Sequence, residues 1–339
     1  MKSTRIIEGL KADALPIQDL IDDGEPAVLK GVVNDWPLVK KGLEGPGAAI
    51  DYLCSFDAGR PIVGYTGAPE IGGRFFYNED VSGLNFEAKR VPLTDFLKCI
   101  ANHLDDPQAP SFYIGSTDLE LFLPGLANEN HLSATLAPFA EYPPLAGIWI
   151  GNRTIASTHY DFSNNIACNL IGHRRFTLFP PDQIANLHPG PLEPTPGGQV
   201  VSMVDLRKPD FDRFPSFRGA LEVAQVAELE PGDLLIYPAM WRHNVEALDP
   251  FNAMINYWWN ATPHFVDTPM TTLLHAILSL RDRPEAEKEA WRLLFDYYVF
   301  GDGGQAAAHL PEHARGILAP LTDPMARRLR ADLLQRINR

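Results

Sequence analysis

The 339-residue sequence has few of the features that mark disulfide-rich or membrane proteins. Its three cysteines, Cys54, Cys99 and Cys168, are far apart and form no Cys-x-x-Cys pair, which argues against a disulfide framework or a zinc ribbon. We expect them to be reduced, buried thiols. No apolar run reaches the roughly 18 residues that a membrane helix needs, and no signal-peptide segment follows Met1. We therefore expect a cytoplasmic protein without a membrane partner.

Positive charge is also scarce, with 29 Lys and Arg against 43 Asp and Glu and a formal net charge of -14. Nonspecific attraction to nucleic acid depends on clustered Lys and Arg, so we expect no nucleic-acid partner. The main basic cluster, Arg327, Arg328 and Arg330, lies in a predicted helix and is best explained as a solvated face. The 45% hydrophobic content allows a large core, in one domain with appendages or in two domains.

The chain divides by pattern into three regions. Residues 1–110 mix short elements that we expect to pack on a barrel: helices over 16–23 and 92–103, and strands over 27–33 and 74–77. Residues 111–262 alternate short apolar strands with Gly, Pro and Asn turns, which is typical of an antiparallel barrel or jelly roll. The proline-rich and glycine-rich segment 188–198 is expected to be a surface loop, either a substrate contact or an ordinary connector.

Residues 263–339 are predicted to be helical. Thr268-Pro269 is a helix-start signal, and apolar stripes follow over 273–278, 285–300 and 325–337. These apolar faces need a partner, which is either the outer wall of the barrel or the same helices of a second subunit. A homodimer through the C-terminal helices is one expectation.

His159-Tyr160-Asp161 and the distant His243 are the candidate metal ligands. Side chains alternate along a strand, so His159 and Asp161 share one face. Two imidazoles and one carboxylate form a facial triad that suits Fe(II) and leaves positions open for reactants. The Pro231-Gly232 turn before the apolar strand that leads to His243 is typical of a barrel that places a ligand at its mouth. The alternative is that both histidines are ordinary hydrogen-bonded core residues.

The strand that follows the first two ligands carries polar side chains on one face. Period two puts Asn165 and Asn169 opposite Ile166, Cys168 and Leu170. Amide groups directed into a barrel usually serve a ligand or a water network.

Several segments together resemble the JmjC and cupin-like 2-oxoglutarate oxygenases, and among them the branch of the asparaginyl hydroxylase that inhibits hypoxia-inducible factor. The matching segments are His159-Tyr160-Asp161, 172–181, Pro231-Gly232-Asp233, His243 and Asn256-Tyr257-Trp258, with weaker matches over 31–37 and the helical tail. The resemblance implies a mainly β fold with α-helices: a double-stranded β-helix, or jelly roll of the cupin and JmjC type, with flanking N-terminal elements and a C-terminal helical region. It also implies bound Fe(II) and 2-oxoglutarate as cosubstrate.

Carried over by position, the resemblance makes His159, Asp161 and His243 the iron ligands. It makes Tyr113, Asn165 and Asn256 residues of the cosubstrate pocket, and the alternative is that these three form hydrogen bonds in the core. Trp258 and Trp259 are large apolar residues that we expect in the core more readily than as a substrate platform.

The chain departs from its relative at two positions. Arg174 stands where the relative has the lysine that pairs with the distal carboxylate of 2-oxoglutarate, and Ala156 replaces a cosubstrate-binding threonine. Arginine suits a carboxylate because it stays charged and offers paired donors. The alternative is that Arg174 is a surface strand residue beside Arg175. Thr158 could supply the missing hydroxyl, although period two turns it away from His159.

The activity that the resemblance implies is that of an Fe(II)/2-oxoglutarate-dependent dioxygenase. Hydroxylation of a protein side chain, a peptide or a small metabolite is the first hypothesis. N-demethylation by the same chemistry and a noncatalytic metal-binding cupin are the alternatives. The substrate cannot be read from the sequence.

Overall fold

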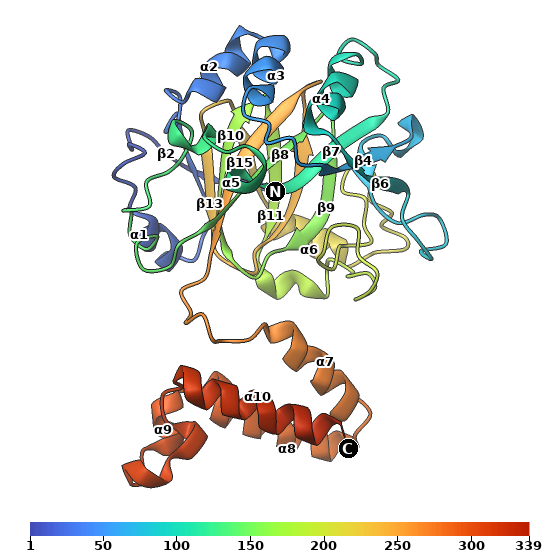
Figure 1. Cartoon of the computed structure of the whole chain (residues 1–339). Coiled ribbons are helices and arrows are strands. Elements are labelled where there is room, and N and C mark those ends of the chain that lie inside the picture. Colours follow the sequence, from blue (N-terminus) through green and yellow to red (C-terminus); the bar gives the residue numbers. More distant parts are fainter. Residues whose placement is uncertain (339) are drawn as a thin grey trace. The chain divides into compact units, whose positions relative to one another are not determined.

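The computed structural model describes residues 1–338 and divides into two compact units. The first, which we call the barrel unit, spans Met1–Ala261, and the second, the helical unit, begins at Thr262. Figure 1 shows the two sheets of the barrel unit and the helices of the helical unit.

Eight strands of the barrel unit form the double-stranded β-helix. Four belong to a nine-stranded sheet: β8 (Leu145–Gly151), β10 (Asn164–Ile171), β13 (Leu234–Tyr237) and β15 (Asn252–Trp259). Four belong to a six-stranded sheet: β9 (Ile155–Tyr160), β11 (Arg174–Phe179), β12 (Gln225–Leu229) and β14 (Arg242–Ala247). Because the chain passes repeatedly from one sheet to the other, the sheets face each other as a jelly roll. The predicted fold class is confirmed.

The N-terminal third of the chain extends both sheets. Its strands are β1 (Lys2–Ser3), β2 (Arg5–Ile7), β3 (Ala27–Leu29), β4 (Ile62–Gly67), β5 (Arg74–Phe75), β6 (Phe86–Val91) and β7 (Ser111–Asp118). The order is β1-β12-β11-β14-β9-β5 in one sheet and β2-β3-β13-β10-β15-β8-β7-β4-β6 in the other. The strand predicted over 27–33 ends at Leu29 because Gly31 takes a left-handed φ of 65° and starts a turn.

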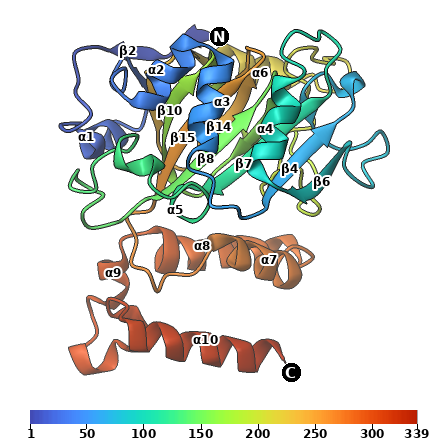
Figure 2. The ribbon, with the colours of Figure 1, turned by 45° about the horizontal axis from the view of Figure 1, so that its top comes forward.

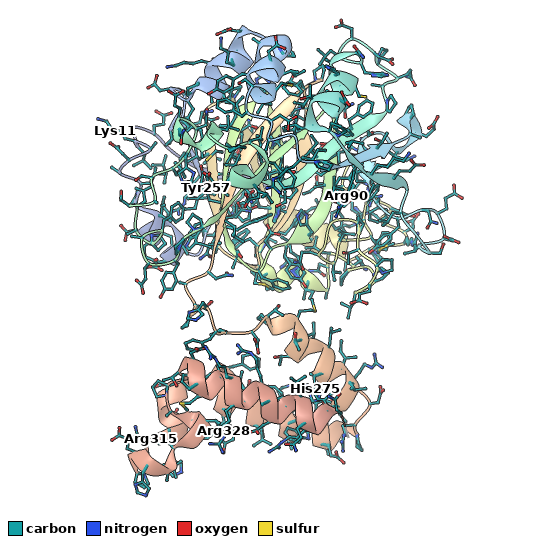
Figure 3. The ribbon with its side chains drawn as sticks, in the orientation of Figure 1. Lys11, Arg90, Tyr257, His275, Arg315 and Arg328 are labelled. Carbon is teal, nitrogen blue, oxygen red and sulfur yellow. The ribbon has the colours of Figure 1, made fainter. Side chains whose placement is uncertain are left out.

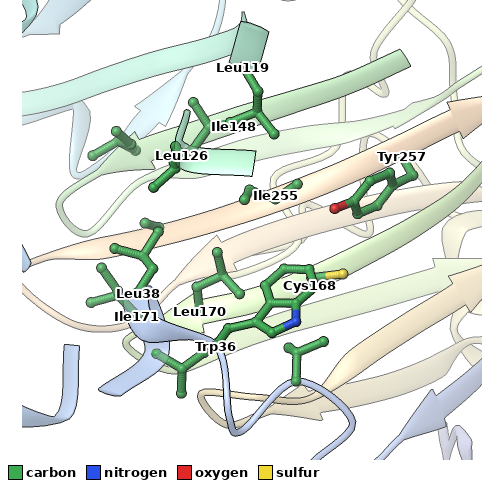
Figure 4. Packing of buried hydrophobic residues seen from close by; sticks show 14 of the residues in the cluster. Trp36, Leu38, Leu119, Leu126, Ile148, Cys168, Leu170, Ile171, Ile255 and Tyr257 are labelled. Atoms are coloured by element: carbon green, nitrogen blue, oxygen red, sulfur yellow. The ribbon is translucent and has the colours of Figure 1, made fainter. Parts of the chain in front are cut away.

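Short helices cover the outer face of the nine-stranded sheet. They are α1 (Ile17–Asp22), α2 (Pro37–Glu44), α3 (Pro46–Cys54), α4 (Leu93–Ala101) and α5 (Leu119–Phe122). A sixth helix, α6 (Phe217–Val223), packs instead in a cluster with Phe179 of the six-stranded sheet. Figure 2 shows α2, α3 and α4 lying over the nine-stranded sheet. Apolar side chains between them form the largest core cluster, in which Trp36 and Leu38 pack near Leu170 and Ile171 (Figure 4).

The cysteines do not share one environment. Cys168 is fully buried in this core, Cys54 is half-buried and Cys99 is exposed, and all three are free thiols. The expectation of three buried cysteines is therefore wrong. Leu93, Phe96, Leu97 and Ile100 form the buried face of α4, and Cys99 lies on the opposite face.

Strand β10 separates the outer core from the barrel interior. Ile166, Cys168 and Leu170 pack in the outer cluster, whereas Ala167 belongs to a second cluster between the two sheets. The predicted alternation thus turns Asn165 and Asn169 inward, toward the interior where the candidate site lies.

The helical unit consists of α7 (Pro269–Ser279), α8 (Glu285–Phe295), α9 (Gly303–Ala307) and α10 (Asp323–Ile337). The helix predicted over 285–300 changes at Asp296 into a π-helical turn, Asp296–Phe300. Figure 3 shows the side chains of this unit, among them His275 on α7 and Arg328 on α10. Within the part of the chain that the structure describes, no helix is both long and apolar enough to cross a membrane.

Candidate metal centre

The three predicted ligands come together in the barrel interior. Strands β9 and β14 are antiparallel neighbours, and their register places His243 opposite His159 with ring centroids 4.3 Å apart. Asp161 follows two residues after His159, and its Oδ2 lies 3.7 Å from His243 Nε2. One ligand atom from each residue lies within 4.8 Å of the others. Two imidazoles and one carboxylate can therefore reach one metal ion from one side.

Backbone carbonyls determine which nitrogen of each histidine faces the site. Nδ1 of His159 is 2.8 Å from the carbonyl oxygen of Ser157, and Nδ1 of His243 is 3.1 Å from that of Trp241. A carbonyl oxygen only accepts, so each Nδ1 carries the proton and donates. Each Nε2 is then left with its lone pair free for a metal, which is the usual outer-shell arrangement of a ligating histidine.

Two donors hold the carboxylate of Asp161. Asn165 Nδ2 donates to Asp161 Oδ2 at 3.2 Å, and the indole Nε1 of Trp258 donates to the same oxygen at 3.1 Å. Asn165 Nδ2 also donates to the Tyr237 hydroxyl at 2.7 Å. The expectation that Trp258 is mainly a core residue is wrong, whereas Trp259 is buried in the core as expected. The two residues separate because adjacent side chains of β15 face opposite sides of the sheet.

Burial keeps His243 neutral. Its side chain is almost inaccessible, and desolvation together with the nearby His159 lowers the pKa of His243 to about 4. A neutral imidazole is the form that binds a metal, so no proton has to leave this residue near neutral pH.

The four residues that the resemblance assigned to the cosubstrate line the same cavity as the triad. Tyr113, Asn165, Arg174 and Asn256 surround a narrow space of about 40 Å³ together with the three ligands. The structure thus brings all seven predicted site residues to one place. They come from β7, β9, β10, β11, β14 and β15, with Asp161 directly after β9.

Arg174 is a buried cation without a carboxylate. Its residue is 4% exposed, so the alternative of a surface position beside Arg175 is wrong. Its Nε donates to Asn169 Oδ1 at 3.3 Å, and no carboxylate among residues 1–338 forms an ion pair with it. Burial lowers the pKa of Arg174 to about 10, and the group stays charged at neutral pH. An unpaired buried charge is costly, so an anionic ligand would stabilise this end of the cavity.

Two amide atoms in the cavity also lack partners. Asn165 Oδ1 and Asn256 Nδ2 are buried, and neither has a hydrogen-bond partner among the described residues. The other amide atom of Asn256, Oδ1, accepts from Trp149 Nε1 at 2.7 Å. Buried polar atoms are usually satisfied, so these two indicate a polar ligand. A facial triad, a lone buried guanidinium and free amide atoms together fit Fe(II) with a dicarboxylate.

Tyr113 lies beside Arg174 at this end of the site. Desolvation raises the pKa of the Tyr113 phenol well above its usual value, so the hydroxyl is neutral and can donate a hydrogen bond. A neutral donor beside a guanidinium is suited to a carboxylate oxygen.

Thr154 is a cavity residue that the sequence reasoning missed. It is buried and lines the space around the triad, on the same side as Ala156. Thr158 is also buried but is not among the residues that line either cavity at the site. Period two counted back from Ala156 gives Thr154, so the alternation that argued against Thr158 could have found it.

The space around the triad is small and adjoins a larger cavity. About 40 Å³ holds one or two water molecules, so a dicarboxylate needs neighbouring side chains to move. Met254 lines this space and has the flexible side chain for such a movement. A second cavity of about 520 Å³ shares Tyr113, Trp149, Ala156 and His159 with it. The metal centre therefore has a volume beside it that suits a substrate.

A family model described as a cupin-like domain matches residues 13–265, which is most of the chain and includes the whole site. The chain belongs to this cupin-like family. The family that the sequence motifs predicted is thus confirmed. The matched segment begins well before β8, the first strand of the double-stranded β-helix, and ends in the first residues of the helical unit.

Curated relatives of this cupin-like chain carry different names. It is 32% identical over 152 residues to human HSPB1-associated protein 1, covering 42% of this chain and 30% of the relative. It is 27% identical over 203 residues to tRNA wybutosine-synthesizing protein 5 of Danio rerio, covering 53% and 56%. It is 23% identical over 240 residues to lysine-specific demethylase 8 of Xenopus tropicalis, covering 70% and 48%. The chain thus spans between 30% and 56% of the length of these relatives.

Proposed function

We propose that this protein is an Fe(II)- and 2-oxoglutarate-dependent dioxygenase that hydroxylates a C–H bond of its substrate. The observation that supports it most is the lone buried cation, Arg174, in the same small cavity as a complete facial triad. A structural histidine pair would explain neither the free Nε2 atoms nor a charged guanidinium without a counter-ion.

In this proposal His159, Asp161 and His243 hold the iron. The carbonyls of Ser157 and Trp241 keep both imidazoles in the correct tautomer, and Asn165 and Trp258 hold the carboxylate. Such outer-shell contacts preorganise the ligands before the metal binds.

The cosubstrate would lie between the triad and Arg174. The guanidinium would pair with one carboxylate of 2-oxoglutarate, and the neutral Tyr113 hydroxyl would donate to it. Asn256 Nδ2 would provide a further donor, because it lacks a partner and Trp149 already holds the other end of the amide.

Iron and 2-oxoglutarate together supply an oxidant from O₂, so that substrate C–H becomes C–OH while 2-oxoglutarate becomes succinate and CO₂. The protein contributes position and exclusion of water. Phe176, Tyr237 and Met254 wall the cavity with apolar surface, which limits side reactions with solvent.

Two alternatives use the same residues. N-demethylation would follow from hydroxylation of an N-methyl group, and the name of the Xenopus relative gives this alternative its support. A noncatalytic metal-binding cupin would keep the triad without turnover. Release of formaldehyde from a methylated substrate distinguishes the first, and absence of succinate the second.

The substrate we propose is a protein side chain, a peptide or a small metabolite. The net charge of -14 supports this over a nucleic-acid substrate, because phosphate backbones are attracted by clustered positive charge.

The test is iron-dependent formation of succinate from 2-oxoglutarate by the full chain and by Asp161→Ala. We expect the variant to lose at least about 100-fold in turnover and to bind Mn²⁺ weakly, since even outer-shell changes cost about 10–100-fold in metal affinity. Asp249→Ala, at an exposed carboxylate that accepts from His173, is the matched control and should keep both properties. Unchanged turnover in Asp161→Ala would refute the proposal.

A further inference from the structure

The larger cavity beside the metal centre is lined by side chains of several strands and one loop. Strands β4, β5, β6, β7, β8 and β9 all contribute to it, and so does the loop over 195–199. His159 reaches into this cavity as well as into the small one. A group bound in the larger cavity would therefore lie next to the metal ligands.

Aromatic rings make one continuous wall of the cavity. Tyr65 and Phe86 pack edge to face with centroids 5.6 Å apart, and Phe75 and Phe86 do so at 5.2 Å. Phe75 then contacts Tyr113 at 5.5 Å. Trp149 extends the wall toward the metal, with its centroid 6.0 Å from that of Tyr113.

No Asp, Glu, Lys or Arg is among the described residues that line this cavity. Its polar groups are neutral ones, such as the hydroxyls of Ser116, Thr117 and Ser157 and the amide of Gln199. A charged group that bound here would give up part of its hydration and meet no oppositely charged Asp, Glu, Lys or Arg in the lining, which is unfavourable. The adjoining small cavity differs in this respect, because charged Arg174 and Asp161 line it.

The aromatic rings of this wall are packed against one another. Tyr65, Phe86, Phe75 and Tyr113 meet edge to face or tilted, with neighbouring centroids 5.2–5.6 Å apart, so no gap between adjacent rings is left for a cation. Together the rings present a joined apolar surface. Such a wall suits the flat or branched surface of an uncharged apolar group.

We propose that this cavity binds an uncharged, mainly apolar group of the substrate, such as an aromatic ring or a branched aliphatic chain. The inference rests on the proposed function and narrows it: the reacting group is a neutral one, and a positively charged methylammonium is disfavoured. The neutral hydroxyls and the Gln199 amide would orient a hydroxyl or carbonyl of the same group.

A pair of probes with the same shape and different charge tests this class. The neutral probe is para-tert-butylphenol, and the cation is para-hydroxyphenyltrimethylammonium. Their dissociation constants would be measured by calorimetry on the full chain loaded with redox-inert Zn²⁺ and 2-oxoglutarate. We expect the neutral probe to bind at least about tenfold more tightly, a difference that calorimetry resolves. Equal or tighter binding of the cation would overturn the proposal and favour demethylation.

Gly115 allows the cavity to be filled from within. A Cβ at this position would lie 3.5 Å from atoms of both Trp149 and Tyr65, which is ordinary contact. Gly115→Leu should therefore occupy part of the cavity and weaken the neutral probe at least about tenfold, and Gly115→Ala should weaken it less. Gly47→Leu is the control, because nothing lies within 4 Å of a Cβ there, and it should bind the probe like the natural chain.

If both Gly115 variants bind the neutral probe as tightly as the natural chain, the probe binds outside the larger cavity. That result would overturn the proposal that this cavity binds the neutral group. Mn²⁺ binding by each variant shows that the metal centre persists; if Gly115→Leu does not fold, Gly115→Ala decides. Because the probe assay needs no turnover, its outcome is independent of succinate formation, and the two proposals can fail separately.

N-acetyl-leucinamide and an acetylated pentapeptide with one central leucine then distinguish a free metabolite from a protein side chain as the source of the neutral group.

Discussion

The barrel unit and the helical unit treat their apolar side chains in opposite ways. In the barrel unit large side chains are buried between sheets and helices; Phe139, for example, is 1% exposed. In the helical unit no described residue of α7 or α8 is buried, and Leu278 and Phe300 are 79% and 75% exposed. The helices of that unit therefore do not cover their own apolar surface.

The difference separates two tasks. A closed, densely packed barrel can hold a buried guanidinium and oriented imidazoles in fixed positions. In its low-dielectric interior, displacing a polar group from its partners costs free energy. The helical unit has exposed apolar faces of the kind that mark interaction surfaces. We propose that a second copy of the chain covers these faces; the outer wall of the barrel is the alternative cover.

The largest effect expected is on stability, from a matched pair of phenylalanines. Phe139→Ala should lower the free energy of unfolding by about 3–5 kcal/mol, because it leaves a cavity in the core. Phe300→Ala should change it by less than about 0.5 kcal/mol at a protein concentration where the chain is monomeric. Urea unfolding of both variants measures this. Similar losses in the two variants would break the comparison between the units.

A second prediction concerns neighbouring arginines in the barrel unit. Arg174→Ala should weaken binding of 2-oxoglutarate by about 2–5 kcal/mol, the usual cost of removing one partner of a buried charge pair. Arg175→Ala should have little effect, since Arg175 pairs with Glu228 at the surface. Calorimetric titration of 2-oxoglutarate into the metal-loaded chain measures both. Equal affinity in the two variants would remove Arg174 from the cosubstrate site.

The smallest effect on the stability of the barrel unit is expected from a substitution in the helical unit. Leu278→Glu should weaken self-association at least about tenfold, because a charge would enter the apolar contact, and it should leave the stability of the monomer within about 0.5 kcal/mol. Sedimentation at several concentrations measures the association, and Mn²⁺ binding checks the barrel. A natural chain that stays monomeric at all concentrations would favour the barrel wall as the cover.

Local patterns predicted much of the fold and the ligands. Alternation along β10 correctly turned Asn165 and Asn169 inward, and the Thr268-Pro269 signal correctly marked the start of α7. The same kind of reasoning misjudged Trp258, because its role depends on Asp161, which lies 97 positions away in the chain. A hydrogen bond between residues so far apart in the chain does not change the local hydrophobic pattern of either segment, so the pattern cannot predict it.

The pattern of residues by itself determined the alternation of the strands and the helical character of the tail, because each depends on near neighbours in the chain. The candidate ligands His159, Asp161 and His243 followed from short motifs and from the family resemblance that these motifs carry. Only the tertiary structure decided that Arg174 is buried without a carboxylate and that an uncharged aromatic cavity adjoins the metal centre. Both properties arise where strands far apart in sequence close around one space, and the burial that results changes the energy of every polar group inside it.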